Sequence, residues 1–84
     1  MVVRMPNTFS VKHIPKAIRY WRKYSGVSQV ELAKRLEVSR QAIYLWETHQ
    51  GYPDIERLEE VAEVLRIPLE FLLKEPPGVI DGSR

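Results

Sequence analysis

The sequence predicts an all-α fold, and three observations lead to that prediction. Apolar residues recur at the three- and four-residue spacing of a helix, as at Ile14, Ile18 and Trp21. Residues that cap helices stand directly before such segments. No segment shows the strict alternation of apolar and polar residues that is typical of a half-buried strand. We therefore expect a compact bundle of five helices.

The first two helices are delimited by their boundary residues. Pro15 suits the first turn of a helix, where its missing N–H loses no hydrogen bond, and Gly26 suits the residue just past a helix end. Together they predict a first helix over residues 15–24. Ser28 and Glu31 form a capping box, S-x-x-E, which starts the second helix. The side chains expected to face inward from the second helix are Ala33, Leu36 and either Val30 or Leu32.

The other three helices follow from the same signals. Ser39 is an N-cap for a third helix over about residues 40–47, and a loop rich in helix breakers comes after it. Asp54 caps a fourth helix, and Pro68 begins a short fifth one over residues 69–74. The apolar stripe expected to face the core from the fourth helix consists of Ile55, Leu58, Val61, Ala62 and Leu65.

Length and composition describe one small domain. The chain has 84 residues, of which 44% are hydrophobic and 29% charged, as in ordinary globular proteins. It contains no cysteine, which excludes disulfides and thiolate metal sites. No apolar run is long enough for a signal peptide or a membrane span, so we expect a soluble, cytoplasmic protein. The predicted organisation is an N-terminal arm (1–13), a helical domain (14–74) and a C-terminal tail (75–84).

The net charge of +2 hides an asymmetry along the chain. Residues 1–50 carry nine Lys or Arg against three Asp or Glu, and residues 51–84 carry four against eight, so the two parts have net charges of +6 and −4. A basic half joined to an acidic half suggests a face that binds a polyanion. The alternative is ordinary solubility charge without a partner.

Residues 29–48 contain the most informative spacing. Two short helices joined by a tight turn need a small residue where their backbones approach, an apolar residue in the turn and an apolar anchor in the second helix. Ala33, Val38 and Ile43 meet these needs at five-residue intervals. This spacing is typical of a DNA-binding helix-turn-helix.

Around this turn the sequence has the pattern Ser28-Gln29-x-x-Leu32-Ala33-x-x-Leu36-x-Val38-Ser39-x-x-x-Ile43-x-x-Trp46-Glu47. With Pro53 and the apolar fourth helix, it resembles the phage-repressor and Cro-type (Xre-type, lambda-repressor-like) helix-turn-helix domains over about residues 14–74. The resemblance implies a five-helix fold that places its third helix in the major groove of double-stranded DNA, as a homodimer on a two-fold operator. It also implies that Arg22 and Glu47 pair and hold the third helix to the scaffold.

The sequence departs from that family pattern at two places. Glu37 occupies a turn position at which the family usually has glycine, and a left-handed conformation at a non-glycine residue costs roughly 1 kcal/mol. The loop after the third helix reads Thr-His-Gln-Gly-Tyr (48–52), where the family usually has Asn-Gly and basic residues. Phosphate contacts from this loop would have to come from His49, Gln50 and backbone N–H groups.

The third helix has two apolar surfaces with different expected roles. A helical wheel places Ala42, Ile43 and Trp46 on the side that packs on the bundle. The opposite side has no core left to cover, and it carries Arg40, Gln41, Tyr44, Leu45 and Thr48. Arg can bind guanine O6 and N7, Gln can bind adenine N6 and N7, and apolar groups can meet a thymine methyl. We predict Arg40, Gln41 and Leu45 as base readers and Tyr44 as a base or phosphate contact. The alternatives are solvated side chains and, for Tyr44, an apolar contact with Tyr52.

Other residues are predicted to contact the DNA backbone. Gln29 starts the second helix, whose positive N-terminal end favours a phosphate. Ser39 is expected to touch phosphate as well as cap the third helix, with capping alone as the alternative. Further phosphate candidates, each of which is alternatively a solvated charge, are Lys12, His13, Arg19, Lys34 and Arg35.

The sequence offers no constellation for catalysis or metal binding. His13 and His49 lie far apart in the chain and lack nearby carboxylate or cysteine ligands. There is no Ser-His-Asp spacing and no Gly-rich phosphate loop. We predict no enzyme activity, no metal and no cofactor.

These observations predict a sequence-specific DNA-binding transcriptional regulator, a repressor that reads a palindromic site as a homodimer. The dimer surface is expected at the fifth helix, where apolar residues exceed what one face of a short helix buries: Leu69, Phe71, Leu72 and Leu73, extended by Val79 and Ile80. A DNA-binding antitoxin with a toxin-binding tail and a restriction–modification controller fit the same pattern. A protein-interaction adapter that uses Tyr44 and Leu45 is the alternative from another class.

Overall fold

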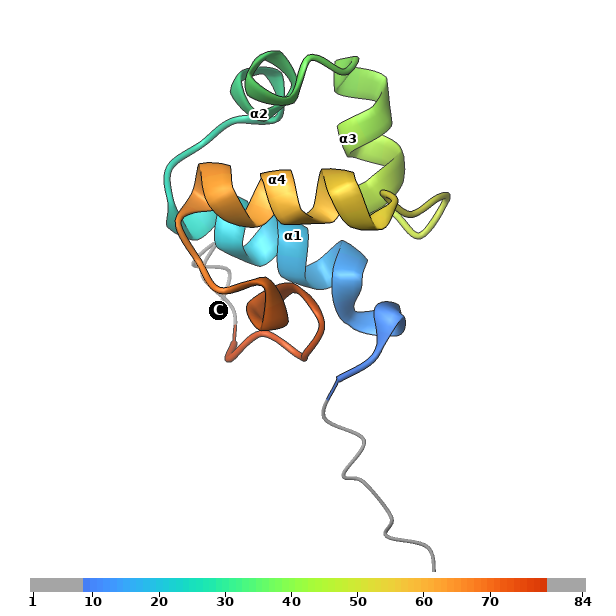
Figure 1. The fold of residues 1–84 in the computed structure, drawn as a ribbon, viewed down its shortest axis with the longest axis vertical. Helices are drawn as coiled ribbons and strands as arrows, with labels where there is room; N and C mark the ends of the chain where they lie inside the picture. Colours follow the sequence, from blue (N-terminus) through green and yellow to red (C-terminus); the bar gives the residue numbers. More distant parts are fainter. Residues whose placement is uncertain (1–8, 79–84) are drawn as a thin grey trace, which may run out of the picture.

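The computed structural model describes residues 9–78, which fold into four α-helices and two 3-10 helices (Figure 1). In chain order these are η1 (Val11–His13), α1 (Ile14–Tyr24), α2 (Gln29–Leu36), α3 (Arg40–Glu47), α4 (Ile55–Leu65) and η2 (Leu69–Leu72). Helices α1 and α4 lie side by side across the middle of the molecule, with α2 and α3 at one end and η2 at the other. No strand occurs among the described residues, as the sequence predicts.

The prediction of a fifth α-helix over residues 69–74 is wrong, because Leu69–Leu72 form the 3-10 helix η2. The Phe71 N–H donates to the Pro68 carbonyl at 3.0 Å, and the Leu73 N–H donates to that of Glu70 at 3.0 Å. Both bonds span three residues, as in a 3-10 turn. Pro76 disfavours a helical conformation at residue 75, so any helix that follows Pro68 has fewer than two α-helical turns.

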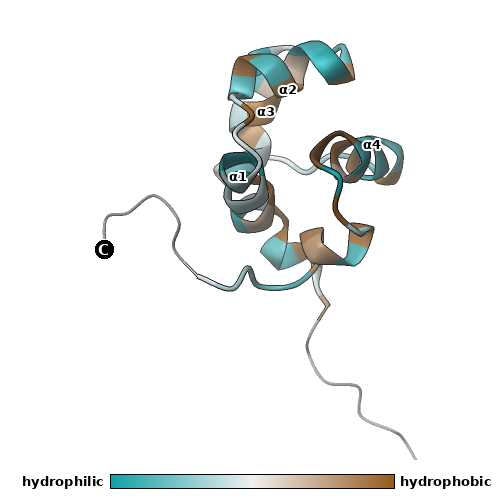
Figure 2. Ribbon diagram, turned by 90° about the vertical axis from the view of Figure 1, so that its left-hand side faces the viewer, coloured by the Kyte–Doolittle hydropathy of each residue, from teal (hydrophilic) through white to brown (hydrophobic). Residues whose placement is uncertain are grey.

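One apolar core holds all four α-helices and η2 together. Ile18 of α1, Leu32 of α2, Ile43 of α3, Val61 of α4 and Leu72 of η2 are fully buried. Helix α4 turns its apolar side toward the other helices and its hydrophilic side outward (Figure 2). The core therefore joins residues from almost the whole described chain, which is the efficient packing that a domain of this size requires.

The burial of the side chains decides two predictions about inward-facing residues. Of the two candidates in α2, Leu32 is buried and Val30 is exposed. Ile55 was expected in the α4 stripe, but its side chain is 60% exposed. Ile55 is the first residue of α4, and the side chains that enter the core begin one turn later, at Leu58.

Helix starts follow the predicted caps. The hydroxyl oxygens of Ser28 and Ser39 accept hydrogen bonds from the backbone N–H groups three residues later, both at 3.0 Å. The carboxylate of Asp54 accepts from the Arg57 N–H at 2.9 Å. These bonds satisfy donors that a helix start otherwise leaves without a partner.

Helix ends share one geometry in all four α-helices. A residue in the left-handed conformation follows each helix, and only the first of these residues is a glycine: Gly26, Glu37, His49 and Arg66, with φ of 74°, 58°, 65° and 60°. The next residue then donates its N–H back across the last turn, as from Val38 to the Ala33 carbonyl and from Gln50 to the Leu45 carbonyl, both at 3.0 Å. This is the Schellman motif, which satisfies carbonyls at the helix end.

The two ends of the described chain meet on the side away from α2 and α3. The Ser10 N–H donates to the Leu73 carbonyl at 2.6 Å, and the Ser10 hydroxyl caps η1. Part of the segment expected as an arm, Val11–His13, is thus a helical turn beside η2. None of the described helices has the length and apolar character that a membrane span requires.

Candidate nucleic-acid interface

The α2–α3 unit has the helix-turn-helix geometry that the spacing predicts. Ala33 and Ile43 are buried in the core, and Val38 packs against it from the turn. Glu37 holds the left-handed conformation, with φ of 58° and ψ of 42°, at the position where the family pattern has glycine. The chain therefore reverses between two eight-residue helices with an unbranched glutamate in place of glycine.

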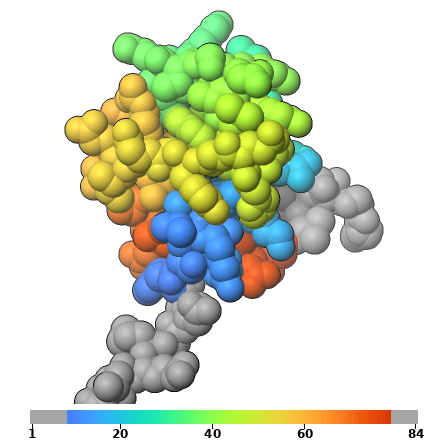
Figure 3. Space-filling view, turned by 90° about the vertical axis from the view of Figure 1, so that its right-hand side faces the viewer, coloured from blue at the N-terminus to red at the C-terminus, as the bar shows by residue number. Residues whose placement is uncertain are grey.

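Helix α3 presents one side to the core and the other to the surface. Ile43 and Trp46 are buried, whereas Arg40, Gln41 and Tyr44 are exposed, Tyr44 to 43%. Figure 3 shows α3 and the following loop as a continuous surface on one side of the molecule. The outward side therefore carries a guanidinium, a carboxamide and a phenol ring within two turns.

Leu45 and Thr48 are less exposed to solvent than the helical wheel predicts. Both are half-buried. The Thr48 hydroxyl donates to the Tyr44 carbonyl at 2.8 Å and accepts from the Gln50 amide nitrogen at 2.9 Å. Its hydrogen atom is thus used inside the helix end, so only the oxygen remains for a further contact.

The residues predicted at the DNA backbone lie around α2 and the start of α3. Ser39 is exposed and caps α3, and Lys34 is exposed on the outer side of α2. The Arg35 Nη2 lies 3.7 Å from Glu31 Oε2, so the Glu31 carboxylate offsets part of the charge of Arg35. Of the further candidates, Lys12 and Arg19 are exposed and His13 is half-buried.

Arg22 and Glu47 form the pair that the family resemblance implies. The Arg22 Nε donates to Glu47 Oε2 at 2.6 Å, and Nη2 donates to Oε1 at 3.0 Å. The third guanidinium nitrogen, Nη1, donates to the Val27 carbonyl at 2.9 Å. With side chains only 9% and 2% exposed, this is a bidentate ion pair inside the domain, and it joins α1 to the end of α3.

Gln29 is a third member of this cluster, which the sequence did not predict. Its Nε2 donates to Glu47 Oε1 at 3.0 Å, so the carboxylate accepts three hydrogen bonds from two residues. Eighteen positions separate Gln29 from Glu47, and no local pattern links them. The sequence signals at Gln29 were its place in the family pattern and its position directly after the cap Ser28, and neither indicates a contact with Glu47.

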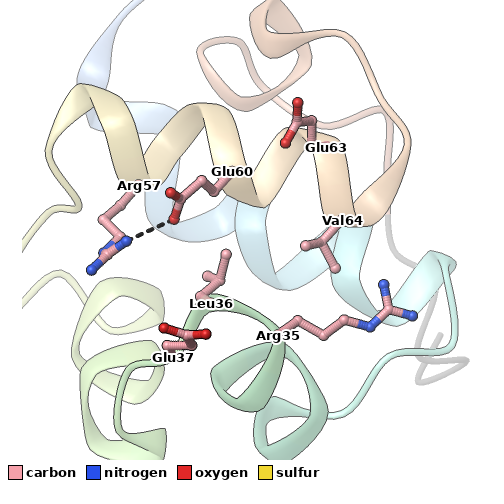
Figure 4. Close-up of a pocket in the computed structure, with 7 residues that line it drawn as sticks. All are labelled: Arg35, Leu36, Glu37, Arg57, Glu60, Glu63 and Val64. Atoms are coloured by element: carbon pink, nitrogen blue, oxygen red, sulfur yellow. Dashed lines mark hydrogen bonds and ion pairs between the residues drawn. The ribbon is translucent and has the colours of Figure 1, made fainter.

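A shallow groove of about 320 Å³ lies between the end of α2 and α4 (Figure 4). Leu36 and Val64 line it together with five charged side chains of both signs: Arg35, Glu37, Arg57, Glu60 and Glu63. Arg57 donates to Glu60 at 2.8 Å, and this contact raises the pKa of the Arg57 guanidinium. Since the charges largely offset one another, the groove offers no uniformly basic surface to a polyanion.

The C-terminal apolar patch differs from the predicted dimer surface. Leu72 is fully buried in the core, so its prediction as a surface residue is wrong; η2 packs against both α1 and α4, and Leu72 is its buried residue. Leu69 and Leu73 are half-buried. The Phe71 ring lies 5.1 Å from that of Trp21. Val79 and Ile80 lie outside the described residues.

A family model for helix-turn-helix proteins matches residues 18–72, well over half of the chain. An uncharacterised HTH-type transcriptional regulator of Sinorhizobium medicae is 29% identical over 80 residues, which are 95% of this chain and 55% of that protein. The HTH-type transcriptional activator BcrR of Enterococcus faecalis is 36% identical over 52 residues, or 62% of this chain and 26% of BcrR. The chain thus spans about half, or less, of the length of these relatives.

Solved structures agree with the family match. The DNA-binding domain of the P22 c2 repressor superposes with a TM-score of 0.69 at 30% identity, covering 83% of this chain and 87% of that domain. SinR, a master regulator for biofilm formation solved in complex with DNA, gives a TM-score of 0.65 at 34% identity, covering 71% of this chain and all of that one. The chain therefore belongs to the Xre-type, lambda-repressor-like helix-turn-helix family of DNA-binding transcriptional regulators.

Proposed function

We propose that the protein is a sequence-specific transcriptional repressor that reads a palindromic DNA site as a homodimer, with α3 in the major groove. The observation that carries this proposal is the outward side of α3. Arg40 and Gln41 are exposed at its first turn, while Ile43, Trp46 and Glu47 fix the helix from the inside. In major-groove recognition, residues near the start of the second helix of the motif reach the base edges.

The base-reading residues are Arg40, Gln41 and Leu45, with Tyr44 at bases or at phosphate. An arginine matches guanine O6 and N7, and a glutamine matches adenine N6 and N7. Half-buried Leu45 offers an apolar edge to a thymine methyl from the same side of the helix. Thr48 contributes through its oxygen, because its hydrogen is donated to Tyr44.

The DNA backbone is contacted from α2 and the turn. Gln29 stands at the positive N-terminal end of α2 and Ser39 at that of α3, and a helix N-terminus suits a phosphate. Lys34 adds a mobile positive charge on the same helix. These contacts carry no sequence information, but they set the register of α3 on the duplex.

Homodimerisation is part of the proposal because one small module buries too little DNA surface for high specificity. The proposed surface keeps the exposed parts of Leu69, Phe71 and Leu73, with Leu72 supporting it from the core. We propose repression by analogy with the P22 c2 repressor, whose DNA-binding domain superposes on this chain with a TM-score of 0.69 at 30% identity.

Selection of bound fragments from a random DNA pool tests this function. The expected result is a palindrome whose half-sites are centred roughly one helical turn apart. The same selection with Arg40→Ala and Gln41→Ala together should return no shared sequence. Enrichment of no sequence by the unmodified chain would contradict sequence-specific binding.

A protein-interaction adapter is the second candidate, and the exposure of Tyr44 beside Leu45 favours it. An apolar protein contact would be nearly insensitive to salt, whereas the logarithm of a DNA affinity falls linearly with the logarithm of salt concentration. Salt titration of the bound complex therefore separates the two candidates.

A further inference from the structure

We propose that Gln29 is a positioning residue for the recognition helix: its amide fixes the angle between α2 and α3 by bonding to Glu47. This inference rests on the proposed function for its DNA consequence, although the angle itself is a property of the free protein. It assigns to Gln29 a role that differs from a phosphate contact.

Helices α2 and α3 form two sides of a triangle, and the contact between Gln29 and Glu47 forms the third side. Helices α2 and α3 each have eight residues, and the turn at Glu37 joins the end of one to the start of the other. Gln29 is the first residue of α2 and Glu47 is the last of α3, so their contact at 3.0 Å closes the open side. Two rigid sides of about 12 Å each and a fixed third side determine the angle between the helices.

The Glu47 end of this contact is held in place. Its carboxylate is 2% exposed and accepts two bonds from Arg22, at 2.6 and 3.0 Å, which tie it to α1. Gln29 is therefore bound to a group that is fixed to the scaffold. Core packing through Leu32, Ala33 and Leu36 places α2 as a whole, and the contact adds a constraint on where the start of α2 lies relative to α3.

The chemistry also fixes the orientation of the Gln29 amide. An ionised carboxylate only accepts hydrogen bonds, so the NH₂ group of Gln29 must face Glu47. Loss of this donor leaves the backbone N–H of residue 29 and the cap at Ser28 unchanged. A substitution can therefore remove the brace while keeping the helix end that faces phosphate.

Gln29→Met tests the inference because methionine has a similar length and no donor. Val30→Ala is the matched control, since Val30 is the next residue of α2 and is exposed. Residual dipolar couplings of the α2 and α3 amides report the angle between the helices without DNA. We expect the angle to change or spread in Gln29→Met and to stay unchanged in Val30→Ala. Unchanged couplings in Gln29→Met would overturn the inference.

DNA binding provides the second readout. In Gln29→Met the affinity ratio of selected site to random DNA should fall roughly tenfold, with the same slope of log affinity against log salt. A uniform loss on both DNAs with a slope smaller by about 1 would instead identify Gln29 as a phosphate ligand and overturn the inference. Gln29→Lys, which restores a donor to Glu47, should recover the wild-type helix angle.

The outcomes separate this inference from the proposed function. If the unmodified chain shows no preference for any DNA site, the proposed function fails while the dipolar couplings still decide whether Gln29 sets the helix angle. If the chain prefers its site and Gln29→Met keeps both the couplings and the preference, only the inference fails.

Discussion

Glu47 connects three helices of the domain through one buried carboxylate. Its carboxylate is almost completely removed from water and accepts three hydrogen bonds from Arg22 and Gln29. Burying a charge is costly unless it is paired and hydrogen-bonded, and Glu47 meets both conditions. Its partners lie on α1 and α2, so one side chain connects the scaffold to both helices of the DNA-binding motif.

Glu47→Ala should lower the free energy of unfolding by about 3–5 kcal/mol, because it leaves the Arg22 guanidinium buried without its counter-ion. Glu60→Ala is the control, since Glu60 pairs with Arg57 at 2.8 Å on the surface and such pairs contribute about 0.2–1 kcal/mol. Urea unfolding measures both. Similar losses in the two variants would show that the Arg22–Glu47 pair has no special role.

Gln41 and Lys34 should separate base reading from backbone contact. Gln41→Ala should reduce discrimination at one base position by roughly 1–3 kcal/mol, because it removes a bidentate partner for adenine. Lys34→Ala should weaken binding to all sequences alike and reduce the salt slope by about 1. Equal effects of both variants on site and random DNA, measured by titration, would contradict the assigned roles.

At the scale of the helices, the same unfavourable backbone conformation recurs at the helix ends. Three of the four α-helices end on a non-glycine residue in the left-handed conformation: Glu37, His49 and Arg66. Such a conformation is unfavourable for residues with a Cβ atom, yet the Schellman bond that follows each of them requires it. The domain therefore retains strain that glycine would remove.

Glu37→Gly should raise the free energy of unfolding by about 1 kcal/mol, because glycine adopts φ near 58° without a Cβ clash. Glu37→Ala removes the charge but keeps the Cβ atom, so it should give no comparable gain. Thermal or urea unfolding of the two variants distinguishes backbone strain from charge. A gain of the same size in Glu37→Ala would attribute the effect to charge instead.

Local signals in the sequence were sufficient for the α-helices and their caps. Ser28, Ser39 and Asp54 cap the helices as predicted, because a cap depends only on residues two or three positions away. The spacing of Ala33, Val38 and Ile43 was sufficient for the turn for the same reason. Both features follow from short-range chemistry.

The predictions that were wrong or missing depend on distant parts of the chain. The apolar pattern of residues 69–74 does not reveal that Leu69–Leu72 form a 3-10 turn, or that Leu72 enters the core. The exposure of Ile55 depends on where the core ends. The Gln29–Glu47 contact joins residues eighteen positions apart, and only the folded arrangement of α2 and α3 brings them together.

At the scale of the whole molecule, the proposed DNA-binding surface and the proposed dimer surface are separate. Helices α2 and α3 occupy one end, and η2, with Ser10 bound to Leu73, occupies the other (Figure 1). The acidic outer side of α4 carries Glu56, Glu59 and Glu63 in exposed positions. Most of the lysine and arginine residues before residue 51 lie on α1, α2 and α3, and we propose that the exposed ones face the DNA.

Sedimentation of the chain with its selected DNA site should show two chains per duplex. Leu69→Gln should reduce this to one chain at the same concentration, because it places a polar group in the proposed dimer surface. Ile55→Gln is the control, since Ile55 is an exposed apolar residue on α4 outside that surface. One unmodified chain per duplex would contradict the proposed homodimer.

Paired titrations of the selected site and a scrambled duplex over a range of salt concentrations test whether α3 reads DNA sequence, as we propose. We expect an affinity for the selected site at least roughly 10³-fold above that for the scrambled duplex, with both affinities falling linearly in a log–log plot against salt. Equal affinities for the two duplexes, or binding that does not respond to salt, would contradict it.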